Sequence, residues 1–177
     1  MLRIVQTLQL PDWWIGAGFV RSKIWDHLHK YSDPTALPDV DVIYFDTFNP
    51  SVEQVKEIKL REKAYEKTLA RMQSGIEWSV TNQSRMHQFH NEPPYHNSTE
   101  ALARWVETAT CIGVRLDTNQ HVMLTAPHGI DDLVNLILRP TPGAGTDTKT
   151  FHERIQKKEW IKKWPKLQII NSSNDLG

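Results

Sequence analysis

The sequence of 177 residues has little of several features that would place it in a specialised class of protein. It has one cysteine, Cys111, which excludes an internal disulfide and fits a reducing compartment. It has no excess charge, because 21 basic residues balance 21 acidic ones, whereas dedicated nucleic-acid binders are usually basic. Its first ten residues contain neither a signal peptide nor a membrane span. We therefore expect a cytoplasmic protein with no membrane partner.

The sequence does contain enough apolar material for one core, since 39% of its residues are hydrophobic. No internal repeat and no linker divides it. We predict one α/β domain over residues 1–170 and a disordered tail over residues 171–177. Periodicity and capping patterns predict helices at 2–9, about 51–72, about 99–107, 130–138 and 150–164. They also predict a hairpin of two strands, 110–117 and 120–125, and an edge strand at 167–170.

Two aspartates, Asp39 and Asp41, lie at the start of a run that is rich in β-branched and aromatic residues. Such a run predicts a strand over about 40–45. Residues two apart share one face of a strand, so both carboxylates point the same way while Val40 and Val42 face the core. Two carboxylates on one face can bind one or two divalent cations. The alternative is a solvated strand start in which Asp39 is a turn residue.

A glycine turn precedes this strand. Gly16-Ala17-Gly18 follows an apolar run and leads into a predicted helix that ends at about His29. The amides and the positive dipole at the N-terminus of a helix form a natural phosphate site, so Gly18 and Phe19 are candidates for phosphate binding. Arg21, predicted in the first helical turn, opposes the dipole unless it faces an anion, either a phosphate or a nearby aspartate. Close packing of helix on strand is the alternative role for the glycines.

The glycine turn followed by Asp39-x-Asp41 resembles the pattern of the polymerase-β-like nucleotidyltransferase superfamily. Further segments resemble a family of small bacterial nucleotidyltransferase-like proteins of unknown substrate: Trp13-Trp14, 41–46, 78–87, 108–110, 113–115 and 164–167. The resemblance implies a polymerase-β-like head, an α/β (α+β) fold with a small mixed sheet flanked by helices. One departure is Gly18-Phe19, where the superfamily usually has Gly-Ser or Gly-Gly. The spacing from Gly18 to Asp39 is also longer than usual.

The resemblance also implies a third carboxylate on a neighbouring strand, and Glu77 is the candidate. In a strand over 76–81, Glu77 shares its face with Ser79 and Thr81, opposite an apolar face. Glu77 then joins the two aspartates as a metal ligand or a general base, or it is an ordinary exposed glutamate. Glu100 and Glu107 are weaker candidates because both fall in a predicted helix.

Four polar residues follow the predicted strand of Glu77 and are candidates for contacts with a nucleotide: Asn82, Gln83, Arg85 and His87. An arginine suits a phosphate, and the amides suit a base edge. A competing interpretation uses His87-x-x-His90, whose spacing places two histidines on one helix face as zinc ligands. No cysteine lies near them, and the arrangement is not that of zinc hydrolases.

The sequence therefore predicts an enzyme that transfers a nucleotidyl group from an NTP to an acceptor hydroxyl, with Mg²⁺ or Mn²⁺ held by Asp39, Asp41 and Glu77. A non-catalytic nucleotide-binding or regulatory module with the same fold, and a zinc-dependent hydrolase, are the alternatives. The acceptor is open: a small molecule, a protein or an RNA end. The basic residues between Arg154 and Lys166 can meet RNA or form a solvated helix face. A monomer is plausible.

Overall fold

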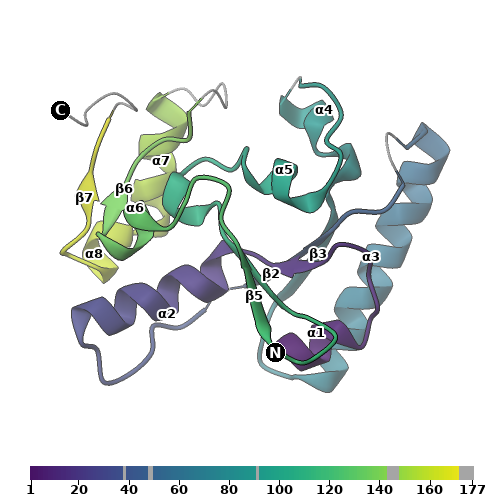
Figure 1. The fold of residues 1–177 in the computed structure, drawn as a ribbon, viewed down its shortest axis with the longest axis horizontal. Helices are drawn as coiled ribbons and strands as arrows, with labels where there is room; N and C mark the ends of the chain where they lie inside the picture. The colour runs from purple at the N-terminus through teal and green to yellow at the C-terminus, as the bar shows by residue number, and fades with distance from the viewer. Residues whose placement is uncertain (38, 48–49, 91, 143–147, 172–177) are drawn as a thin grey trace.

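A computed structural model of the chain describes residues 1–37, 39–47, 50–90, 92–142 and 148–171. The described part contains a five-stranded mixed sheet in the order β3 (Trp78–Asn82), β2 (Val40–Tyr44), β1 (Trp14–Ile15), β4 (Gly113–Leu116) and β5 (Val122–Thr125). A second sheet pairs β6 (Ile137–Leu138) in parallel with β7 (Gln168–Ile169). Helices flank the larger sheet, so the expected α/β (α+β) class with a small mixed sheet is confirmed (Figure 1). Apart from residue 171, the predicted tail lies outside the described residues.

The longer helices are α2 (Ala17–His29), α3 (Val52–Met72) and α7 (Thr148–Lys158). Shorter helices complete the described part: α1 (Leu2–Gln6), α4 (His87–His90), α5 (Ser98–Leu102), α6 (Asp131–Val134), α8 (Trp160–Lys163) and the 3₁₀ turns η1 (Gln83–Arg85) and η2 (Thr108–Thr110). The C-terminal helices lie on the side of the molecule opposite α3, and α2 extends from the sheet to that side, below α8 in this view (Figure 1). No helix among the described residues is long and apolar enough to cross a membrane.

The strand pair β2–β3 is the part of the sheet that positions the aspartates. The two strands are parallel, with Asp41 paired to Ser79 and Tyr44 to Asn82, and they are joined through α3. Parallel strands need a long crossover of this kind. Val40, Val42 and Tyr44 are at most 2% exposed and lie in the core on one face, as the alternation predicts. The opposite face, which carries Asp41, is therefore left to form a site.

One of two helix starts follows the local sequence closely, and the other is displaced. Ser51 caps α3 by accepting a hydrogen bond from the backbone N–H of Gln54, whose side chain bonds back to the N–H of Ser51. This capping box confirms the predicted helix. Helix α2 begins at Ala17 with Gly16 as its N-cap, so the turn consists of Gly16 alone. Gly18 is already helical and Arg21 opens the second turn, one turn later than predicted.

Four predicted helices differ from the structure in length or continuity. The helix predicted at 2–9 ends at Gln6. The helix at 99–107 ends at Leu102, and the helix at 130–138 is only the four residues of α6. The last helix is broken at Glu159, whose φ of 52° lies in the left-handed region, and it resumes as α8. Leu136, with a φ of 61°, interrupts the helix predicted at 130–138 before β6. The predicted hairpin is confirmed, although its first strand begins at Gly113.

The core consists of separate clusters. One lies under the sheet and includes Val42, Val80 and Val114. A second joins α2 to the C-terminal helices through Trp25, Trp160 and Trp164, whose rings meet edge to face. Aromatic rings packed in this way bury large areas in few residues. Helix α2 therefore ties the sheet to the C-terminal region, and the space between them is where the pocket lies.

Candidate active site

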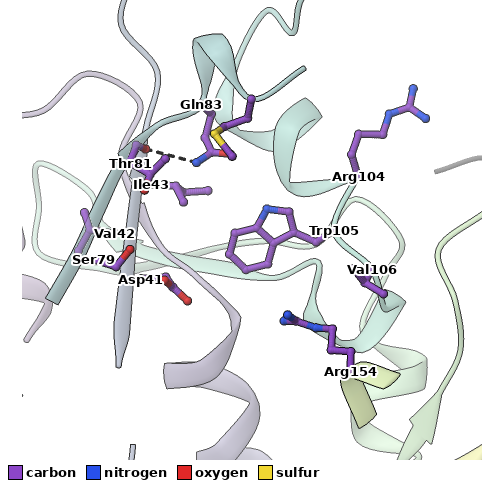
Figure 2. A pocket seen from close by; sticks show the side chains of 11 residues that line it. Asp41, Val42, Ile43, Ser79, Thr81, Gln83, Arg104, Trp105, Val106 and Arg154 are labelled. Carbon is purple, nitrogen blue, oxygen red and sulfur yellow. Dashed lines mark hydrogen bonds between the residues drawn. The ribbon is translucent and has the colours of Figure 1, made fainter. Parts of the chain in front are cut away.

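A pocket of about 280 Å³ lies on the aspartate-bearing face of β2 and β3. Its wall combines the strand residues Asp41, Val42, Ile43, Ser79 and Thr81 with Gln83, Met86, Arg104, Trp105, Val106 and Arg154. The carboxylate of Asp41, the indole of Trp105 and the guanidinium of Arg154 face the same space from three different elements (Figure 2). A concave space with an apolar wall and a few converging polar groups is typical of a ligand site.

Asp41 is the charged group on the sheet side of this pocket. Burial raises the pKa of its carboxyl above the ordinary value, and the negative charge of Asp39 raises it further. A side-chain hydrogen bond from Ser79 and the positive charges of Lys158 and Arg154 oppose this shift of the pKa. The two carboxylates are thus close enough for their charges to interact, and the prediction that they share one face of the strand stays a prediction. Two neighbouring carboxylates attract a cation.

Glu77 lies beside the start of β2, because its backbone oxygen accepts a hydrogen bond of 2.8 Å from the N–H of Val40. Its side chain, however, is exposed. Within the part of the chain that the structure describes, no group of three or more His, Cys, Asp or Glu side chains is arranged to hold a metal ion. Asp41 lines the pocket and Asp39 does not, and the roles of Asp39, Asp41 and Glu77 as metal ligands stay predictions.

The start of α2 lies close to the aspartates, but its arginine is buried. Arg21 is 9% exposed, and its guanidinium carbon lies 4.5 Å from the ring centroid of Trp160 and 5.3 Å from that of Trp25. Burial lowers the pKa of Arg21 to about 10, against the opposing effect of Glu107, so the side chain is still cationic at neutral pH. Phe19 packs on the core of the sheet, and the predicted phosphate contacts of Gly18, Phe19 and Arg21 stay predictions.

Of the four polar residues that were candidates for nucleotide contacts, Gln83 alone lines the pocket. Asn82 is fully buried and joins the ends of two strands: its amide donates to the carbonyl of Asp46 at 2.6 Å, and its Oδ1 accepts from the N–H of Asp46 and of Ser84. Its hydrogen-bonding groups are thus used within the protein, whereas Gln83 can also meet a ligand.

Arg85 and His87 face inward as well. Arg85 is 7% exposed and pairs with Glu62 of α3 through two hydrogen bonds. His87 is 5% exposed and its ring packs edge to face on that of Tyr95, with centroids 6.0 Å apart. Both residues therefore have structural partners, and their contacts with a nucleotide stay predictions. The zinc interpretation stays a prediction, because the side chain of His90 lies outside the part of the chain that the structure describes.

Trp105 is a pocket residue that the sequence pattern does not reveal. It packs against Ile43 and Leu102 beside the sheet. Its indole also explains the need for glycine at position 16, because an ideal Cβ at Gly16 would lie 2.6 Å from Cη2 of Trp105. The first glycine of Gly-Ala-Gly is visible in the sequence, but no neighbouring residue indicates that it contacts Trp105. Gly18 is different, since a Cβ there would lie 3.9 Å from its nearest neighbour, Nη2 of Arg21.

Arg154 and Glu107 form the second feature that sequence reasoning missed. Nε of Arg154 lies 2.9 Å from Oε1 of Glu107. The Glu107 side chain is fully buried, and its Oε2 accepts a hydrogen bond of 2.9 Å from the hydroxyl of Thr110. Burial raises the pKa of Glu107, and Arg154 is the main group that opposes this. The ion pair holds Arg154 at the pocket, with its guanidinium directed toward the space in front of Asp41 (Figure 2).

Comparison with known proteins identifies the chain. A family model described as Nucleotidyltransferase matches residues 3–169, which is nearly the whole sequence. The chain belongs to this nucleotidyltransferase family. An NMR structure described as a CCA-adding enzyme head domain is 33% identical, with a TM-score of 0.76 over 97% of this chain and 87% of that one. The expected polymerase-β-like nucleotidyltransferase head is therefore confirmed.

Two larger nucleotidyltransferases share the fold at lower similarity. A CCA-adding enzyme with ATP and the Thermotoga maritima CCA-adding enzyme complexed with tRNA are each 14% identical, with TM-scores of 0.51 and 0.53. They align with 95% and 96% of this chain, which spans only 37% of the length of each. No curated protein matches the sequence. These two likenesses show the fold of the nucleotidyltransferase head and nothing about its substrates.

Proposed function

We propose that this nucleotidyltransferase moves a nucleotidyl group from an NTP to an acceptor hydroxyl in the pocket at Asp41, with Mg²⁺ or Mn²⁺ as cofactor. The observation that carries the proposal is the position of Asp41. Its carboxylate, which the charge of Asp39 makes harder to ionise, lies on the wall of a pocket that also contains an arginine and an aromatic ring. Family membership supports the reaction class.

The donor groups at this site fit a magnesium ion. Mg²⁺ in phosphoryl-transfer sites is bound by one or two carboxylates, with waters and substrate phosphates completing its coordination. Asp39 and Asp41 supply such a pair, because their charges are close enough for Asp39 to raise the pKa of Asp41 beyond the effect of burial. When bound, the ion would neutralise charge on the phosphates and the leaving group. Asp39 and Asp41 are the residues that would hold it.

The remaining residues of the pocket suit the rest of an NTP. In the reaction, the acceptor oxygen forms a bond with the α-phosphorus, the bond to the β-phosphate oxygen breaks, and pyrophosphate leaves while the acceptor loses its proton. Trp105 offers an apolar face on which a base can stack, and such stacking tolerates any base. Thr81 and Gln83 offer hydrogen-bonding groups for the base or ribose. Arg154 offers a cation for phosphate.

These contacts do not determine which NTP is the donor or which molecule is the acceptor. Among structures of the same fold, CCA-adding enzymes have been solved with ATP, with CTP and with tRNA. An NTP donor and an RNA end as acceptor are consistent with these neighbours. A small-molecule or protein hydroxyl is an equal candidate, because the chain has no excess positive charge.

A second candidate function is a non-catalytic module that binds a nucleotide in the same pocket. The exposed side chain of Glu77 favours it, since no third carboxylate joins Asp39 and Asp41 among the described residues. In this case the protein binds an NTP and never releases pyrophosphate from it.

A transfer experiment tests the proposal and separates the two candidates. The protein is incubated with each of the four α-³²P-labelled NTPs, Mg²⁺ and, in turn, total RNA, a small-molecule extract and a protein extract. We expect covalently attached label from at least one mixture, and its loss in Asp41→Asn. The matched control is Asp46→Asn, an aspartate just after the same strand that pairs with Arg61 outside the pocket. Tight NTP binding with no label transferred to any acceptor would support the non-catalytic module instead.

A further inference from the structure

A second hollow, which we call the α7 groove, adjoins the pocket at Asp41. It has a volume of about 460 Å³ and is lined by Val106, Thr150, Glu153, Arg154, Lys157 and Lys158. Val106 and Arg154 line both spaces, so the pocket and the α7 groove adjoin at these two residues. A ligand that fills the pocket can therefore extend along α7.

The α7 groove is positively charged. Arg154, Lys157 and Lys158 outnumber Glu153, the one acidic residue of its lining. Within the described residues neither Lys157 nor Lys158 has an ion-pair partner, whereas nearby Lys162 lies 3.1 Å from the carboxylate of Glu159. The groove thus combines a concave shape with two lysines that have no ion-pair partner, and an anion would supply one.

Opposite charges face each other across these two spaces. Arg154, which lines both of them, lies across the pocket from Asp41 (Figure 2). The pocket and the α7 groove thus have negative charge on the sheet and positive charge on α7. A polyphosphate with a bound metal ion needs both kinds of charge in its binding site. Carboxylates bind the metal, and cations bind the phosphate oxygens that the metal does not contact.

Arg154 is better placed than Arg21 to contact such an anion. Arg21 is 9% exposed and stacks on Trp25 and Trp160. The side chain of Arg154 is 37% exposed, and its Nε is held by buried Glu107 while the guanidinium points toward the pocket (Figure 2). An arginine fixed at one nitrogen loses less conformational freedom when its other nitrogens bind a phosphate.

We propose that the α7 groove binds the β- and γ-phosphates of the NTP and then the pyrophosphate that leaves, through Arg154, Lys157 and Lys158. This inference rests on the proposed function for the reacting end of the substrate. In the reaction, the bond between the α-phosphorus and the bridging oxygen breaks, and that oxygen leaves with its electron pair as part of the pyrophosphate. The cations of α7 stabilise the charge that develops on the leaving group.

The size of the two spaces agrees with this division of the substrate. Sites for ligands of this size span about 300–1,000 Å³, and the pocket at Asp41 alone, with about 280 Å³, lies below that range. The pocket with its tryptophan wall suits a nucleoside, and the α7 groove adds the room and the charge that three phosphates require.

Calorimetry with inorganic tripolyphosphate tests the proposal without an acceptor or a reaction. The variant is Lys157→Ala with Lys158→Ala, and the control is Lys162→Ala, an exposed lysine of α8 outside the α7 groove. We expect the double variant to bind tripolyphosphate and pyrophosphate at least tenfold more weakly. The control should match the wild type, and so should the affinity of every variant for an unphosphorylated nucleoside. Unchanged affinity of the double variant for tripolyphosphate would overturn the proposal.

A parallel titration with a single-stranded RNA oligonucleotide distinguishes phosphate binding from nucleic-acid binding. If the double variant loses RNA affinity while keeping its affinity for tripolyphosphate, the α7 groove is an RNA surface and the proposal is wrong. The result is also separable from the proposed function. If the double variant loses tripolyphosphate binding but the wild type transfers no label, the phosphate site in the α7 groove is supported and the enzymatic function is rejected. If the wild type transfers label but the double variant binds tripolyphosphate normally, the enzymatic function is supported and the phosphate site in the α7 groove is rejected.

Discussion

Arg85 donates hydrogen bonds from both terminal nitrogens to the carboxylate of Glu62, at 2.7 and 2.9 Å, and both side chains are less than 10% exposed. Glu62 also accepts a hydrogen bond of 2.6 Å from the backbone N–H of Asn82 at the end of β3. The pair therefore fastens α3 to the sheet next to the pocket. A bidentate pair of this kind is strong only while both partners are present, because each charge is buried.

We predict that Glu62→Gln destabilises the protein by about 3–5 kcal/mol, because it leaves the charge of Arg85 buried and uncompensated. The measurement is urea-induced unfolding. Arg61→Ala, which removes an exposed ion pair with Asp46, should cost less than about 1 kcal/mol and is the control. If Arg85→Lys lowers NTP affinity while the free energy of unfolding is unchanged, Arg85 is a nucleotide ligand and this structural account of it is wrong.

The two glycines at the start of α2 should respond in opposite directions. Gly16→Ala forces its new methyl group against Trp105, so we expect loss of stability and a displaced tryptophan in the pocket. Gly18→Ala has room for its Cβ and lies within the helix, so it should stabilise the protein by about 0.5–1 kcal/mol. Thermal unfolding of both variants measures this. Equal destabilisation by the two substitutions would contradict the assignment of Gly16 as the contact with Trp105.

These glycines show how far the sequence could predict the site. The strand of Asp39 and Asp41, the long helix α3 and the strand β3 could be predicted because alternation and capping are local patterns. The residues on the opposite wall of the pocket could not be predicted from the sequence. Trp105 and Arg154 come from segments more than 60 residues further along the chain, and no local period indicates where such a segment packs.

The same reason explains the errors in the C-terminal half. Residues 130–138 have a helical pattern, yet α6 stops after four residues because Leu136 adopts a positive φ and leads into β6. That strand forms only by pairing with β7, a contact some thirty residues away. The sequence pattern predicts Glu107 in a helix, but α5 ends at Leu102, and the buried carboxylate of Glu107 pairs with Arg154. In both segments, contacts with residues distant in the sequence determine the local structure.

The raised pKa of Asp41 predicts how stability depends on pH without metal. Because the folded pKa lies above the unfolded one, the folded state binds the proton more tightly. The free energy of unfolding should therefore fall as pH rises from the unfolded to the folded pKa of this group, and the penalty is complete above it. Asp41→Asn removes the penalty, so it should be more stable than the wild type at neutral pH and lose this advantage on acidification.

Urea unfolding of both proteins between pH 3 and 8 in EDTA measures the difference. Addition of Mn²⁺ at neutral pH should stabilise the wild type and leave Asp41→Asn unchanged, since a ligand stabilises only the folded state that binds it. A wild-type protein that is more stable than Asp41→Asn at neutral pH in EDTA would contradict the electrostatic account of the pair.

Binding of Mn²⁺, measured by electron paramagnetic resonance with and without ATP or CTP, tests the central claim most directly. Asp39 and Asp41 should hold the ion, and an NTP should tighten its binding because phosphate oxygens complete the coordination. The account predicts at least tenfold weaker Mn²⁺ binding in Asp39→Asn with Asp41→Asn, no strengthening by NTP in that variant, and normal binding in Asp46→Asn. Mn²⁺ binding of undiminished affinity in the double variant would contradict the assignment of these aspartates as the metal site.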